Sequence, residues 1–219
     1  MARPKVFERP RPASNGMRIL IGTPIHICKD YAMERWLKSV SELVHPHDLM
    51  MVDNSPDASY LEKVRGYCKK FGITDYKLAR IGVDQGLCVD GKISYAREII
   101  RQEILTKGYD AWCTLECDVI APPNALDELV RLIGDFVEVN HSYPCRQDPD
   151  RVDYAFGLSL VKREALEKYG FIGQYGHCDP EAPDCWHGGE SWFMRRVLMG
   201  GDKYINVFGI IGPVFHLSR

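Results

Sequence analysis

The sequence predicts a single α/β domain with a mixed, mainly parallel, Rossmann-like sheet flanked by helices. Over the first 135 residues, short apolar runs alternate with segments of helical periodicity. This alternation is typical of parallel strands joined by right-handed crossovers. The length of 219 residues, with 45% hydrophobic and 26% charged residues, suits one globular unit. We expect a flexible lead-in (1–16) and a domain (17–219) with a regular half (17–135) and a less regular half (136–219).

The regular half begins with an apolar strand that ends at Thr23-Pro24, and Asp30 is placed to cap the helix that follows. Gly72 ends the second helix, and Pro122-Pro123 start the last one. The expected elements are strand 17–22, helix 31–43, strand 48–52, helix 59–71, a weaker strand 76–81, a Gly-rich loop 82–91, helix 92–106, strand 111–115 and helix 124–133.

The less regular half has weaker periodicity and one segment without any. We expect strands at 136–139 and 154–161, a short helix at 163–169, an irregular segment at 173–188, a helix at 192–198 and a strand at 204–211.

Composition and charge exclude several classes of protein. The net charge of -2 provides no global basic field for nucleic acid or an anionic membrane. No apolar run approaches the roughly 18 residues of a membrane helix. The N-terminus has no apolar signal-like run, and none of the eight cysteines forms a CxxC pair. We therefore expect a cytoplasmic protein with reduced thiols.

Acidic side chains follow the strands of the regular half. Glu116 and Asp118 come directly after strand 111–115, and their spacing points both to the same side. Thr23 and Asp53 also lie at strand ends, where ligands of parallel sheets bind. Carboxylate oxygens suit Mg²⁺ or Mn²⁺ beside substrate phosphates. The sequence thus predicts a cation and a diphosphate in one crevice; the alternative is a solvated strand end with unrelated acids.

Five segments also form an ordered set of motifs. They are ILIGTP at 19–24, MVDNSPD at 51–57, SYAR at 94–97, LECD at 115–118, and GES at 189–191 with Arg195 after it. The set, which covers residues 17 to about 216, resembles nucleotide-sugar glycosyltransferases of the GT-A fold, with family 2-like enzymes as the nearest pattern. The matching family segments are the first strand, the "VDDGSTD" segment, the "ARN" segment, the DxD motif and the "GED…R" segment.

The resemblance implies a metal-dependent glycosyltransferase that moves a sugar from a nucleoside diphosphate donor to an acceptor hydroxyl. Residues 17–135 would bind the nucleotide and 136–219 the acceptor, which could be a glycan, a small molecule, a protein or modified DNA. The implied site residues are Thr23, Pro24, Asp53, Asn54, Arg97 and Glu116 for the donor, Asp118, Glu116 and His216 for Mn²⁺ or Mg²⁺, and Glu190 and Asp184 for catalysis.

Two departures from the family pattern leave the stereochemistry open. Ser191 stands where the family has its second acid, so Glu190, Asp184 or Asp179 would have to deprotonate the acceptor. In addition, Trp186 to Glu190 resembles the "WGGE" segment of retaining and galactose-type GT-A enzymes.

Other interpretations stay open at this point, as do the sugar, the base and the oligomeric state. A nucleotidyltransferase can share the fold, although the first loop lacks its Gly-rich basic signature. A non-catalytic nucleotide-sugar-binding module is a third possibility, with Ser191 marking a lost base. His216 could be a frayed terminal residue. A zinc site could form from four residues whose spacing matches no common finger: His177, Cys178, Cys185 and His187.

Overall fold

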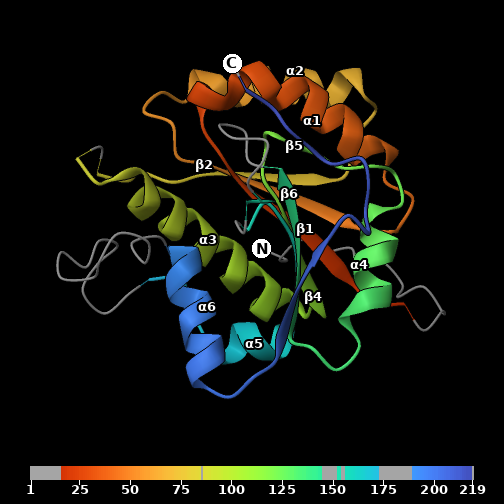
Figure 1. Cartoon of the computed structure of the whole chain (residues 1–219). Coiled ribbons are helices and arrows are strands. Elements are labelled where there is room, and N and C mark those ends of the chain that lie inside the picture. Colours follow the sequence, from red (N-terminus) through yellow and green to blue (C-terminus); the bar gives the residue numbers. More distant parts are fainter. Residues whose placement is uncertain (1–15, 85, 145–151, 154–155, 173–188, 219) are drawn as a thin grey trace, which may run out of the picture.

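The computed structural model describes residues 16–84, 86–144, 152–153, 156–172 and 189–218 (Figure 1). The predicted lead-in up to residue 15 and the segment 173–188, including Asp179, Asp184 and the four candidate zinc ligands, lie outside the described residues.

The centre of the fold is a mixed sheet in which parallel pairing dominates. Its strands follow the order β3-β2-β1-β4-β8-β6-β7, and β9 also pairs with β6. Strands β1 to β4 pair in parallel, whereas β8 runs antiparallel between β4 and β6. Their bounds are β1 Ile19–Ile25, β2 Asp48–Asp53, β3 Tyr76–Arg80, β4 Ala111–Leu115, β6 Glu138–Pro144, β7 Val152–Asp153, β8 Leu158–Lys162 and β9 Tyr204–Phe208. The mainly parallel α/β sheet predicted from the sequence is confirmed.

Helices cover both faces of this sheet (Figure 1). One face packs against α1, α2 and α4, and the other against α3, α5 and α6. The helices are α1 Asp30–Glu42, α2 Ser59–Lys70, α3 Val89–Lys107, α4 Ala125–Ile133, α5 Arg163–Lys168 and α6 Gly189–Met199, with a 3₁₀ turn, η1, at Ile27–Lys29. In the described part of the chain, no helix combines the length and apolarity that a membrane span needs.

Aromatic packing holds α6 against the sheet, and a glycine lets α3 lie close to it. Phe171 stacks on Phe193 of α6 with ring centroids 4.7 Å apart, and Trp112 of β4 meets Phe171 edge-on at 5.1 Å. A Cβ atom at Gly22 would lie 2.3 Å from Ile100 Cγ2 and 2.7 Å from Trp112 Nε1. The glycine therefore lets β1 and α3 approach closely.

The structure shifts some predicted boundaries, each for a local reason. Strand β1 continues through Pro24 to Ile25, because β2 pairs with it as far as Ile25, whereas β4 pairs with it only as far as Gly22. Pro24 therefore has a strand neighbour only on the β2 side, an edge-like position that tolerates proline. Helix α3 begins at Val89 rather than 92, so the predicted Gly-rich loop is shorter. Strands β5 (Val119–Ile120) and β10 (Phe215–His216) form a separate antiparallel pair that the sequence did not indicate.

Candidate active site

Three strand ends define the candidate site. The register pairs Ile25 of β1 with Asp53 of β2. On the other side of β1, the buried Thr23 hydroxyl donates a 2.8 Å hydrogen bond to the Leu115 carbonyl at the end of β4. The ends of β2, β1 and β4 therefore lie next to one another at one edge of the sheet, where ligands of such sheets bind.

Asp118 lies just beyond β4 and is only 1% exposed. Its Oδ2 atom forms an ion pair with the Lys29 ammonium, accepts a 2.9 Å hydrogen bond from the Tyr31 hydroxyl and lies 3.4 Å from His216 Nε2. Burial alone would raise the pKa of Asp118, but the contacts with His216 and Lys29 outweigh it and hold that pKa below its usual range. The Asp118 carboxyl group is therefore ionised at neutral pH.

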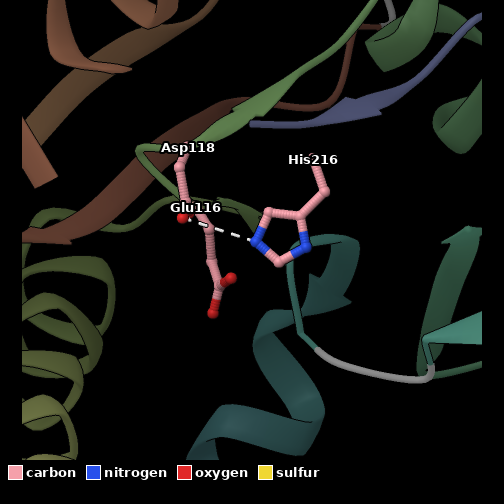
Figure 2. Close-up of side chains that lie close together, drawn as sticks. All are labelled: Glu116, Asp118 and His216. Carbon is pink, nitrogen blue, oxygen red and sulfur yellow. Dashed lines mark ion pairs between the residues drawn. The ribbon is translucent and has the colours of Figure 1, made fainter. Parts of the chain in front are cut away.

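Glu116, Asp118 and His216 converge (Figure 2). One ligand atom from each lies within 4.8 Å of the others. His216 reaches this place because β10 pairs with β5, which sets His216 opposite Val119. Two carboxylates and an imidazole are a suitable donor set for Mn²⁺, and for Mg²⁺ if water completes the shell. The three residues therefore fit the cation that the sequence predicted.

Arg97 of α3 links two acidic side chains. Its Nη2 atom lies 2.7 Å from Glu190 Oε2 and 3.5 Å from Glu116 Oε1, while its guanidinium group stacks over the Phe156 ring at 5.5 Å. Burial, followed by the nearby Glu190 carboxylate, raises the pKa of Glu116 to about 7, although Arg97 opposes this shift. One buried cation from α3 and one acid from α6 thus lie beside Glu116 of the cluster.

The start of α6 is placed by a close contact with α3. A Cβ atom at Gly189 would lie 2.0 Å from Ser94 Oγ and 2.7 Å from the Phe171 carbonyl oxygen. Only glycine permits this approach. The contact sets Glu190, the next residue, within reach of Arg97.

The end of β2 offers two buried acceptors. Asp53 Oδ1 accepts a 2.9 Å hydrogen bond from the Ser55 backbone. Asp53 Oδ2 and Asn54 Oδ1 are buried and, among the described residues, have no hydrogen-bond partner. Burial lowers the pKa of the neighbouring His26, and the Asp53 charge acts in the opposite direction. Unpaired buried acceptors are costly, so this pair suits a ligand that brings N–H or O–H donors.

The structure thus gathers the predicted site residues Glu116, Asp118, His216, Arg97 and Glu190 into one contact network, with Asp53, Asn54, Thr23 and Pro24 on the adjacent strands. Their functional roles stay predictions. The sequence reasoning missed Lys29 and Tyr31, the partners of Asp118. Their only signal was their position close after the first strand, Lys29 before the first helix and Tyr31 in its first turn.

Comparisons with known proteins support the fold. No protein-family model and no curated protein sequence matches the chain. Solved structures do. A mannosyltransferase from Pyrobaculum calidifontis, PcManGT, in complex with GDP-Man and Mn²⁺ matches 88% of this chain and 55% of its own, with a TM-score of 0.65 and 16% identity. The glycosyltransferase GlyE of Streptococcus pneumoniae matches 88% of this chain and 45% of its own, with a TM-score of 0.54 and 13% identity.

The chain has a GT-A glycosyltransferase fold. A third match, residues 1–349 of S. aureus TarS, covers 69% of this chain and 49% of its own, with a TM-score of 0.50 and 12% identity. The chain spans about half the length of these solved structures.

Proposed function

We propose that the chain is a metal-dependent glycosyltransferase that moves a sugar from a nucleoside diphosphate donor to an acceptor hydroxyl. The observation that carries the proposal is the convergence of Glu116, Asp118 and His216 at the end of β4, on the same edge of the sheet as the end of β2. PcManGT, whose fold resembles this one, was solved with GDP-Man and Mn²⁺. The same kinds of ligand suit the acidic cluster and the two buried acceptors.

Each group has a role that follows from its chemistry. Asp53 and Asn54 would accept hydrogen bonds from the ribose hydroxyls or the base. Asp118, Glu116 and His216 would hold Mn²⁺ or Mg²⁺, which neutralises charge on the departing diphosphate. Thr23 and Pro24 would shape the floor of the nucleotide site, because they lie near the end of β1, the strand between β2 and β4.

Arg97 and Glu190 would act at the sugar. The guanidinium group of Arg97 is buried and can donate to oxygens of the diphosphate or the sugar. The Glu190 carboxylate pairs with the Arg97 guanidinium group and is 29% exposed, so it can also accept a hydrogen bond from a hydroxyl of the donor or acceptor. Glu190 or Asp184 would serve as the base that takes the acceptor proton, if the reaction needs one.

The test is an Asp118→Asn variant, which removes the ligand charge and keeps the side-chain shape. The unmodified protein should release nucleoside diphosphate from one member of a panel of nucleotide sugars when Mn²⁺ is present. The variant should lose this activity by about 100-fold or more while its unfolding curve shows a folded protein. Asp127→Asn, at an exposed acid of α4, is the matched control and should keep full activity.

Three results would overturn the proposal. Turnover of the Asp118→Asn variant at the parent rate with a chelator present would exclude the metal role. Binding of a nucleotide sugar with no release of nucleoside diphosphate would indicate a non-catalytic module. Formation of pyrophosphate from a nucleoside triphosphate and a sugar phosphate would indicate a nucleotidyltransferase instead.

A further inference from the structure

Lys29 occupies a position for which the proposed reaction has no role so far. It ends η1, and its ammonium pairs with Asp118 Oδ2, the oxygen that also faces His216 Nε2. That oxygen belongs to the cluster suited to a divalent cation. An ammonium and a divalent cation repel each other at contact distance. A cation bound through Asp118 Oδ2 must therefore displace Lys29.

The displaced ammonium has freedom to move. The Lys29 side chain is 34% exposed, whereas Asp118 is only 1% exposed. Lys29 can thus leave its partner without opening the core, while Asp118 stays in place. The Tyr31 hydroxyl, 2.9 Å from the same oxygen, keeps a neutral donor on Asp118 after the exchange.

The displaced ammonium would meet a phosphate. The donor diphosphate is expected beside the cation, between the ends of β2 and β4, and Lys29 follows β1, the strand between them. A lysine ammonium carries three donors on a flexible stem and binds phosphate as a point charge. The same residue that neutralises Asp118 can thus neutralise the diphosphate.

We propose that Lys29 is a phosphate-binding residue that exchanges partners, leaving Asp118 for the donor diphosphate when the divalent cation takes its place. This inference rests on the proposed function and adds a residue to its donor site. It makes two predictions of opposite sign. Removing the ammonium should strengthen binding of the divalent cation alone, because a competitor for Asp118 is lost. The same change should weaken binding of the nucleoside diphosphate.

The experiment measures binding to Lys29→Met by isothermal titration calorimetry. With Mn²⁺ alone as the probe, we expect the variant to bind at least about threefold more tightly than the unmodified protein. With saturating Mn²⁺, we expect binding of a nucleoside diphosphate to weaken about 10- to 100-fold, the usual effect of losing a charged hydrogen bond. The probe is whichever of UDP, GDP, ADP, CDP and TDP binds the unmodified protein best.

Two further variants make the result decisive. Lys29→Gln keeps a hydrogen bond to Asp118 without the charge, so it should show the same two opposite shifts even if Lys29→Met folds poorly. Lys70→Met removes an ammonium that pairs with Glu34 on the outer helices, and should change neither affinity.

The outcomes separate this inference from the function it rests on. If the Lys29 variants bind both Mn²⁺ and the nucleoside diphosphate more weakly, or if neither affinity changes, the exchange is wrong and the metal site survives. If the unmodified protein binds neither Mn²⁺ nor any nucleoside diphosphate, both the proposed function and the exchange fall.

Discussion

The free energy of unfolding should fall as pH rises toward 8 because of Glu138, and replacing Glu138 with glutamine should remove this fall. Glu138 lies on β6 opposite Val161, a member of the apolar cluster under α3, α5 and α6. Directly paired residues share a face of the sheet, so the glutamate faces that cluster. Its side chain is fully buried, and neither carboxyl oxygen has a hydrogen-bond partner among the described residues.

The magnitude follows from its titration. Burial, together with the charge of Glu190, raises the pKa of Glu138 to about 8. A glutamate in the unfolded chain titrates near 4.3. Between about pH 4.3 and about pH 8, the folded protein therefore holds a proton that the unfolded chain releases. Over this interval the free energy of unfolding falls as pH rises, by about 1.4 kcal/mol per pH unit and on the order of 5 kcal/mol in total.

The assay compares urea unfolding of the unmodified protein and Glu138→Gln at several pH values from 5 to 8.5. The difference in free energy of unfolding should grow in favour of the variant by about 1.4 kcal/mol per pH unit up to about pH 8, then level off. Glu42→Gln, at an exposed glutamate of α1, should leave the shape of the pH profile unchanged. Parallel profiles for the unmodified protein and Glu138→Gln would refute the reasoning.

Two further substitutions test the site. Asp53→Asn should weaken nucleoside diphosphate binding by about tenfold and leave Mn²⁺ affinity unchanged, since Asp53 is not in the metal cluster; equal nucleotide affinity, measured by calorimetry, would contradict its role. Gly189→Ala should lower the free energy of unfolding by about 1–3 kcal/mol, because the new methyl group meets Ser94 and the Phe171 carbonyl. Gly66→Ala, whose methyl group meets nothing within 4 Å, is the control in urea unfolding; equal losses from both substitutions would argue against the close contact.

The regular half of the fold could be predicted because local signals and tertiary structure agree there. The apolar run before Glu116 is a buried strand in the structure, and the one-residue spacing of Glu116 and Asp118 places both in the cluster. The carboxyl ends of parallel strands lie at one edge, so the placement of Asp53 and Asp118 at the same edge of the sheet also followed from the alternation of elements.

What could not be predicted depends on contacts between distant residues. Glu138 has the sequence context of an ordinary strand residue, and only the tertiary structure shows that it is fully buried. Lys29 and Tyr31 meet Asp118 across 89 and 87 residues of chain, which no local pattern encodes. Two-residue strands such as β5 and β10 carry too little periodicity to detect, so the setting of His216 was also missed.

The β5–β10 pair also gives the site an adjustable part. Strand β10 pairs with β5 through two residues, Phe215 opposite Ile120 and His216 opposite Val119, and the Leu217 amide donates a 2.8 Å hydrogen bond to the Asp118 carbonyl. Such a short ladder opens more readily than the central strands. The free energy needed to form this β5–β10 ladder would reduce the contribution of His216 to the affinity for a divalent cation. Under the proposed function, substitutions at Ile120 or Phe215 should therefore change the affinity for a divalent cation, although Glu116, Asp118 and His216 stay the same.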